Sequence, residues 1–190
     1  MNLWKNYLRW RHSRGFGVHS PYAYRFVIDV LRPGPYRLYS YHEVDNYLHK
    51  KEKHDFRFEK LIMFTLRMIV FLHAKRIIIN IDARVGEIAA KALNLSWVRI
   101  KEKDEFRFKE GDFLIIENSF TSKGLLFEAI KNGVPIFAIN PDSEIRKVLE
   151  TPIPRGLLLN DPQKIILVPR QEMEYVSYDI NLGLGFGRHA

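Results

Sequence analysis

The feature that most constrains the fold is a series of short apolar runs, rich in β-branched residues, in the second half of the chain. Three of them are each followed by a segment of helical composition, and they lie at residues 77–81, 113–117 and 135–139. A continuous apolar run indicates a strand buried on both faces, and strands that alternate with helices indicate a parallel sheet between two helical layers. We therefore expect a three-layer α/β fold.

The carboxy-terminal part of the chain predicts a different arrangement of strands. Two apolar runs, 156–160 and 164–169, flank Asp161 and Pro162, which favour a type I turn. These runs predict an antiparallel hairpin at the end of a mainly parallel sheet. A sixth strand is expected at 97–101.

The first third of the chain has helical patterns. Helices are expected at residues 2–12, 21–31, 41–51 and 56–73. Ser20 and Pro21 together form a strong start signal for the second of them. We expect a helical leader at 1–54, an α/β domain at 55–180 and a flexible tail at 181–190. The leader should pack on the domain through large apolar side chains, namely Leu3, Trp4, Phe16, Tyr22 and Phe26.

Composition excludes several classes of protein. The 190 residues include no cysteine, which rules out a disulfide scaffold and a zinc site with Cys ligands. The most apolar run, 61–72, contains Arg67 and is shorter than the roughly 20 residues that cross a bilayer. We expect a cytoplasmic protein that does not bind membranes, because no export signal is visible either. The sequence leaves the oligomeric state open.

Positive charge is concentrated at the amino terminus. Residues 1–54 hold ten Lys and Arg residues against four acids, which is +6 of the total net charge of +8. Aromatic residues are interleaved with these cations. One interpretation is a surface that binds nucleic acid or an acidic partner, because cations contact phosphates and rings stack on bases. The other is a solvated helical surface whose rings are buried.

The segment RHSRGFGVHSPYAYRFVIDVL, from Arg11 to Leu31, carries a specific resemblance. It resembles the amino-terminal HGFGxHSPF signature of a group of bacterial class I S-adenosylmethionine-dependent methyltransferase-like proteins, with His19 and Ser20 among its signature residues. The resemblance covers most of the chain to Arg170. It implies a Rossmann-like methyltransferase fold that follows a helical leader.

The resemblance also points to a cofactor-binding loop. In such methyltransferases the loop after the first strand reads E-x-G-x-x-x-G or a close variant, because glycine lets the backbone approach the methionine moiety. The matching positions here are Asn80, Asp82, Arg84 and Gly86. Asp82 and Arg84 either form a salt bridge that fills the cofactor position or hold an altered ligand. Glu102 is either the acid that binds the ribose hydroxyls or a surface charge.

A second departure from the family concerns the third strand. Nine residues separate Glu102 from Asp112, whereas a helical crossover between parallel strands needs about a dozen or more. The family's third strand is therefore expected to be missing. Glu117 matches the family's acidic position and is the candidate catalytic residue, since a carboxylate at a strand's carboxyl end can take a proton. The next strand ends in Asn140 and Pro141 instead of acids, so no metal is predicted.

Three functions follow from these observations. The first is a degenerate S-adenosylmethionine-dependent methyltransferase-like protein that serves as a binding or structural module with impaired cofactor binding. The second is an active methyltransferase with an unknown acceptor. The third is a nucleic-acid-binding protein that uses the basic leader. A fold alone does not distinguish them.

Overall fold

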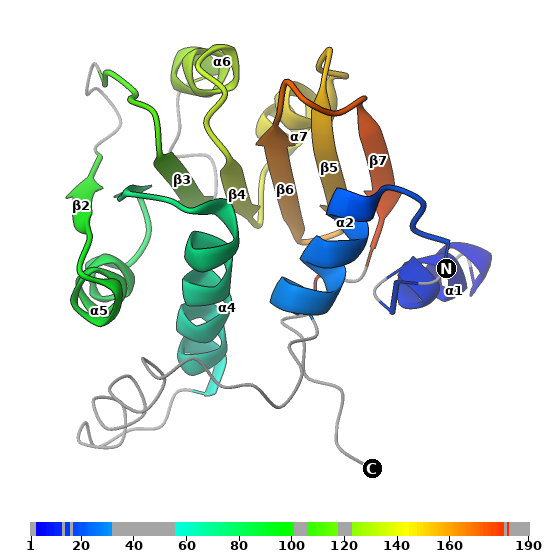
Figure 1. Cartoon of the computed structure of the whole chain (residues 1–190), viewed down its shortest axis with the longest axis horizontal. Helices are drawn as coiled ribbons and strands as arrows, with labels where there is room; N and C mark the ends of the chain where they lie inside the picture. The colour runs from blue at the N-terminus through cyan, green and yellow to red at the C-terminus, as the bar shows by residue number, and fades with distance from the viewer. Residues whose placement is uncertain are drawn as a thin grey trace.

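The structure is a computed structural model, and it describes residues 3–12, 14–15, 17–31, 56–100, 106–117, 123–180 and 182. Seven strands form one sheet in the order β2-β1-β3-β4-β6-β5-β7 (Figure 1). The strands are β1 (Arg76–Ile79), β2 (Ser96–Arg99), β3 (Asp112–Glu117), β4 (Ile136–Ile139), β5 (Gly156–Asp161), β6 (Lys164–Pro169) and β7 (Val176–Asp179).

The sheet is mainly parallel, as the sequence predicts. β6 pairs antiparallel with β4 and β5, and every other pair of neighbouring strands is parallel. The expected hairpin is therefore confirmed as β5 and β6, with β6 inserted between β4 and β5. β7 was not expected. Its segment alternates apolar and polar residues from Val176 to Ile180, which is the pattern of a strand with one apolar and one polar face.

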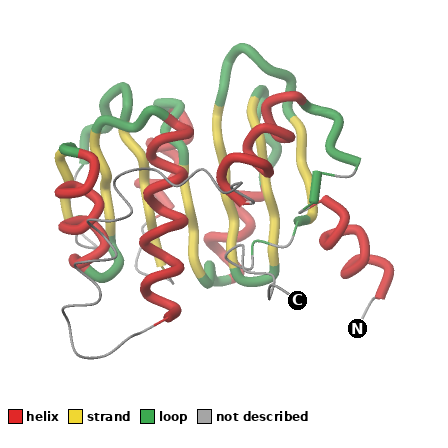
Figure 2. Tube along the Cα trace, turned by 60° about the horizontal axis from the view of Figure 1, so that its bottom comes forward, coloured by secondary structure: helices red, strands yellow, loops and turns green. Residues whose placement is uncertain are grey.

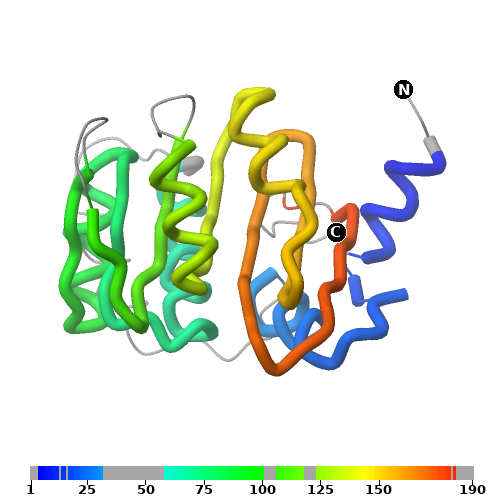
Figure 3. The backbone as a smooth tube through the Cα atoms, turned by 90° about the horizontal axis from the view of Figure 1, so that it is seen from above, coloured from blue at the N-terminus to red at the C-terminus, as the bar shows by residue number. Residues whose placement is uncertain are grey.

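Helices cover both faces of the sheet. The helical elements are α1 (Leu3–His12), α2 (Pro21–Phe26), the π-helix η1 (Val27–Leu31), α4 (Phe56–Leu72), α5 (Ala83–Leu93), α6 (Lys123–Lys131) and α7 (Ser143–Glu150). One face packs against α2, η1, α4 and α5, and the opposite face packs against α6 and α7 (Figures 2 and 3). Side chains alternate between the two cores, as in β1, where Ile77 and Ile79 face one core and Ile78 the other. The three-layer α/β fold is confirmed.

No described strand lies beyond β2, which pairs with β1 alone and forms one edge of the sheet. Residues 106–110, which lead from β2 toward β3, form neither helix nor strand. Phe106 and Phe108 pack edge to face, with ring centroids 5.2 Å apart, against the same core as α6 and α7. Two aromatic rings thus cover a part of the sheet that a crossover helix would otherwise cover.

The amino-terminal elements pack on the domain. Phe26, Val27 and Val30 are fully buried in the core beneath α4. Ser20 caps α2 as predicted, because its Oγ accepts a hydrogen bond from the Ala23 N–H at 3.3 Å. The helix predicted over 21–31 changes to π-helical geometry at Val27.

The expectation that Trp4 is buried is wrong. Its side chain lies on the outward face of α1 and is 64% exposed. Tyr22 is partly buried, as part of the expected packing. Phe16, the side chain of Leu3 and the helix predicted at 41–51 lie outside the described residues.

The carboxy-terminal end of the domain reaches residue 182. Leu182 is fully buried, and its N–H donates to Asp161 Oδ2 at 3.1 Å. Leu182, two residues after the boundary predicted at 180, therefore packs against the domain. Residues 181 and 183–190 of the expected flexible tail lie outside the described residues. Within the described part of the chain, no helix combines the length and apolarity that crossing a membrane requires.

Candidate functional site

The sheet has one position where its topology favours a binding site. From β1 the chain continues to β2 on one side, and β3 then lies on the other side of β1. Ligands of open α/β sheets bind outside the carboxyl ends of the strands at such a reversal of strand order. The candidate site is therefore the edge where β1 and β3 end, which holds Asn80 and Glu117.

Asn80 and Glu117 meet through one hydrogen bond. The Asn80 side-chain Oδ1 accepts from the Glu117 backbone N–H at 2.8 Å, and the Asn80 N–H donates to the Ile115 carbonyl at 3.2 Å. Asn80 therefore ties together the ends of two neighbouring strands. Glu117 is half-buried, and no ion pair of its carboxylate is present among the described residues.

Asp82 and Arg84 form a salt bridge, one of the two arrangements that the sequence allows. Arg84 Nε and Nη2 donate to Asp82 Oδ2 at 2.8 and 2.5 Å, and the Arg84 guanidinium lies 4.5 Å from the ring centroid of Phe58 on α4. Asp82 is also the N-cap of α5, since its Oδ1 accepts from the Arg84 N–H at 3.0 Å. The hydrogen bonds from Arg84 lower the pKa of the Asp82 carboxyl below its ordinary value, so this carboxylate stays ionised at neutral pH.

Gly86 has a packing role within α5. A Cβ added at this position would lie 2.6 Å from Trp97 Cε3 and 2.9 Å from Ile79 Cδ1. Glycine thus lets α5 approach β1 and β2 closely, which is one reason for glycine in a strand-turn-helix unit. The structure accounts for Gly86 without a ligand.

Replacing Gly86 with alanine should lower the free energy of unfolding by about 1–3 kcal/mol, because an added methyl overpacks the space beside Trp97. Gly124→Ala is the matched control. Gly124 also lies in a helix, but a Cβ there meets nothing within 4 Å, so the control should be neutral or stabilise by up to about 1 kcal/mol. Urea denaturation of both variants measures the difference. Equal effects at the two glycines would refute the packing role.

Two other predicted residues remain, Gly86 and Glu102. Glu102 lies outside the described residues. Gly86 lies within α5, as described above. No group of three metal-binding side chains of His, Asp or Glu occurs in the described part of the chain.

The loop after β4 stabilises the start of α7. Asn140 has a left-handed backbone, with φ of 46°, and its N–H donates to the Gln163 carbonyl at 2.6 Å. Asp142 caps α7, since its Oδ1 accepts from the N–H groups of Glu144 and Ile145 at 2.9 and 2.8 Å. The residues that follow β4 therefore fix local structure.

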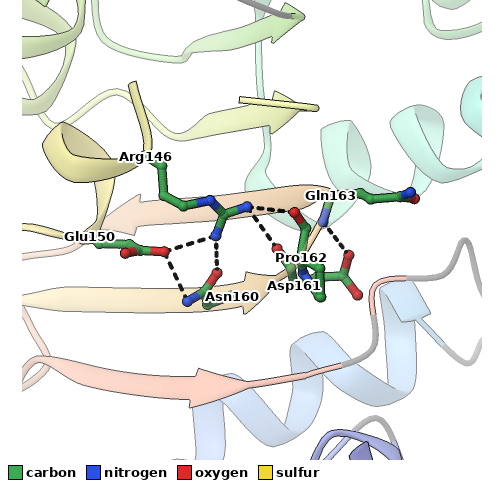
Figure 4. A network of polar contacts seen from close by, with 6 residues as sticks. All are labelled: Arg146, Glu150, Asn160, Asp161, Pro162 and Gln163. Carbon is green, nitrogen blue, oxygen red and sulfur yellow. Dashed lines mark hydrogen bonds and ion pairs between the residues drawn. The ribbon is translucent and has the colours of Figure 1, made fainter. Parts of the chain in front are cut away.

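A polar cluster that the sequence did not predict holds the β5–β6 turn (Figure 4). Arg146 Nη1 donates to Glu150 Oε1 at 2.8 Å and to Asn160 Oδ1 at 2.7 Å. Arg146 Nη2 donates to the carbonyls of Asp161 and Pro162 at 3.0 and 2.9 Å. The guanidinium thus bridges α7 and the hairpin. The i,i+4 spacing of Arg146 and Glu150 was visible in the sequence, but the carbonyl partners depend on the fold.

The leader signature lies at the far end of the sheet from β1 and β3. The Tyr178 hydroxyl on β7 accepts hydrogen bonds from the backbone N–H groups of His19 and Ser20, both at 3.2 Å. The turn before them contains Gly15 and Gly17 with φ of 78° and 76°. Since β4, β6 and β5 separate β7 from β3, His19 and Ser20 do not belong to the candidate site. The contacts that His19 and Ser20 make attach the leader to β7.

Comparisons of the chain with models of known protein families, with curated protein sequences and with solved structures found no match. The fold is an α/β fold with a seven-stranded mixed sheet, and this arrangement is compatible with a Rossmann-like fold.

Proposed function

We propose that this chain is a methyltransferase-like binding or structural module in which its own side chains occupy the position of S-adenosylmethionine. The observation that carries the proposal is the Asp82–Arg84 salt bridge at the amino end of α5. The resemblance of the leader implies a cofactor loop at these positions. In this chain, the loop holds an ion pair, and Asp82 stands where the family pattern has its first glycine.

The residues present do not fit the cofactor. A helix amino terminus attracts an anionic group because its first N–H groups lack partners within the helix. At α5 the Asp82 carboxylate already accepts from the Arg84 N–H, so this helix end has an anionic cap of its own. The same capping by a carboxylate occurs at α7 through Asp142.

Two further observations agree with this proposal. The glycine that matches the family pattern, Gly86, is used to pack α5 against Trp97. No described strand follows β2 at the sheet edge, where the family's third strand and its adenine-binding loop would lie. Among the described residues, the family's third strand thus has no counterpart at this edge, and the remaining glycine of the pattern serves packing.

An active methyltransferase is the competing function. One observation favours it: Glu117 is half-buried at the strand-order reversal, and no ion pair of its carboxylate is present among the described residues. A carboxylate in such a place can accept a proton from an acceptor substrate. This function requires binding of the methyl donor, so a test of cofactor binding separates the two proposals.

We expect that neither S-adenosylmethionine nor S-adenosylhomocysteine raises the thermal midpoint of the wild type or of the Asp82→Gly/Arg84→Gly variant. A ligand that binds the native state must raise its apparent stability, so thermal shift and titration calorimetry over a range of ligand concentrations measure binding. The double substitution itself should cost about 1–2 kcal/mol, because it breaks a largely exposed ion pair, removes the N-cap of α5 and places a glycine in the first turn of that helix.

The matched control is Arg170→Gly/Glu172→Gly, which removes another exposed i,i+2 ion pair away from the site. A concentration-dependent shift in the wild type and the control, abolished in the Asp82/Arg84 variant, would show that the loop binds the cofactor and would reject the proposal. A shift in all three proteins would reject it as well. A shift in the Asp82/Arg84 variant alone would support it, because the ion pair would then be what blocks the position.

A further inference from the structure

Helix α1 lies beyond the edge strand β7, at the end of the molecule opposite β2 (Figures 1 and 3). His12, on the side of α1 that faces the sheet, holds the helix against β7. The His12 Nδ1 lies 2.7 Å from the Asp179 carbonyl, and its ring packs edge to face on Tyr178 with centroids 5.5 Å apart. The helix is thus fixed on one side, and its other side faces away from the sheet.

Three large aromatic rings occupy the outward face of α1. Trp4, Tyr7 and Trp10 are 64%, 47% and 45% exposed. Their i,i+3 spacing places them on one face of the helix, and successive ring centroids are 5.7 and 6.1 Å apart. The interpretation of the leader as a solvated helix with buried rings is therefore wrong for this helix. A row of exposed rings is a feature of interaction surfaces.

Arginine side chains lie among these rings. The Arg11 guanidinium is 5.8 Å from the centroid of Tyr7, and the Arg14 guanidinium is 4.3 Å from that of Trp10. No acidic residue occurs in the first 28 residues, which hold five Lys and Arg residues. The outward face, defined here as Trp4, Tyr7, Trp10, Arg11 and Arg14, therefore combines aromatic surface with an excess of positive charge.

We propose that this outward face of α1 binds single-stranded nucleic acid. Rings and cations on one surface match the two parts of a single strand, because bases stack on aromatic side chains and phosphates attract guanidinium groups. Three rings offer a short platform for consecutive bases. This site is separate from the strand-order reversal, and the inference does not depend on the proposed function.

The composition of the face favours a nucleic acid over a lipid surface. Binding of a helix to a bilayer grows with the apolar area that it inserts, and cations of such helices gather on the opposite, polar face. Here Arg11 and Arg14 lie against the rings themselves. The opposite side of the helix is held against β7.

The first test measures the contribution of the rings. The full chain is titrated into fluorescently labelled uridine and thymidine oligomers of about 12 nucleotides, and binding is followed by anisotropy. Trp10→Ala should weaken binding about 5- to 100-fold, the usual range for removal of one stacking ring. Phe127→Ala is the control, because Phe127 is an equally exposed ring, at 56%, on α6. It should leave the affinity unchanged.

The second test measures the contribution of the cations. Arg11→Gln/Arg14→Gln should weaken binding and reduce the slope of log affinity against log salt, measured between about 50 and 200 mM salt. The reduction should be about 0.7 for each phosphate that is no longer neutralised by an arginine. Lys91→Gln/Lys131→Gln removes two exposed charges from α5 and α6 and should leave the slope unchanged. Far-UV circular dichroism confirms that each variant is folded.

Three outcomes would overturn the proposal. The first is no binding of either oligomer at about 50 mM salt. The second is binding that Trp10→Ala leaves unchanged, since the interaction would then be charge attraction without stacking. The third is binding to phosphatidylserine vesicles, but not to the oligomers, that is abolished in the Trp10→Ala variant. That result would assign the face to a lipid surface.

Discussion

Replacing Arg76 with methionine is expected to lower the free energy of unfolding by about 3–5 kcal/mol, the usual effect of leaving a buried charge without its partner. The Asp112 side chain is 1% exposed, and Arg76 Nε and Nη2 donate to its Oδ1 and Oδ2 at 2.7 and 2.6 Å. Oδ2 also accepts from the Lys109 N–H at 2.6 Å. Without the guanidinium, a charged carboxylate would stay buried with one backbone donor.

Urea denaturation of three variants tests this expectation. Arg76→Met/Asp112→Asn should recover most of the loss, because asparagine is neutral and its Oδ1 can still accept from Lys109. Arg25→Met is the control, since it breaks an exposed ion pair with Asp29 and should cost no more than about 1 kcal/mol. A loss of less than about 1 kcal/mol in Arg76→Met would contradict the expectation.

The Arg76–Asp112 pair could not be predicted from the sequence. The partner of Asp112 depends on strand register, because Arg76 and Asp112 are directly opposite each other in the β1–β3 ladder. Register between strands 36 residues apart follows from tertiary packing and not from a local pattern. The pair lies at the amino end of β3, so it fastens residues 107–112 and takes no part in the candidate site.

Most of the sheet could be predicted because its strands are short apolar runs with clear limits. Helix α7 lies in the helical segment expected after the run at 135–139, since Asp142 is a strong N-cap and the helix has one apolar side. β7 was missed, although the alternation from Val176 to Ile180 would have indicated it. The π-helical geometry from Val27 onward has no counterpart in a local pattern.

The candidate site was predicted in part. The short separation of Asp82 and Arg84 made a salt bridge one of two expected arrangements, and the structure contains it. The packing of Gly86 on Trp97 was not predictable, because it needs the position of α5 over β2. The placement of Arg84 over Phe58 was not predictable either, because Phe58 belongs to α4, some 25 residues earlier in the chain. Whether this loop still binds a cofactor is the question that the thermal-shift experiment answers.

Replacing Phe26 with alanine is expected to destabilise the whole domain by about 3–5 kcal/mol, the usual cost of removing a buried phenylalanine. Phe26 is fully buried, and its ring packs edge to face on Phe71 of α4 with centroids 5.2 Å apart. Trp4→Ala is the control. Trp4 is also an aromatic residue of the leader, but it is exposed, so its removal should change stability by no more than about 0.5 kcal/mol.

The shape of the urea unfolding curve of Phe26→Ala tests this prediction as well as the midpoint does. Because α2 and η1 share one core with α4 and the sheet, the Phe26→Ala variant should unfold in a single cooperative step at a lower urea concentration. A separate early transition, with the main step unchanged, would show that the leader is an independent unit. Proteolytic removal of residues 1–35 that leaves the thermal midpoint unchanged would show the same. The expected result is that the leader cannot be removed without loss of the fold, since Phe26, Val27, Val30 and Leu31 are buried in the same core as α4 and the sheet.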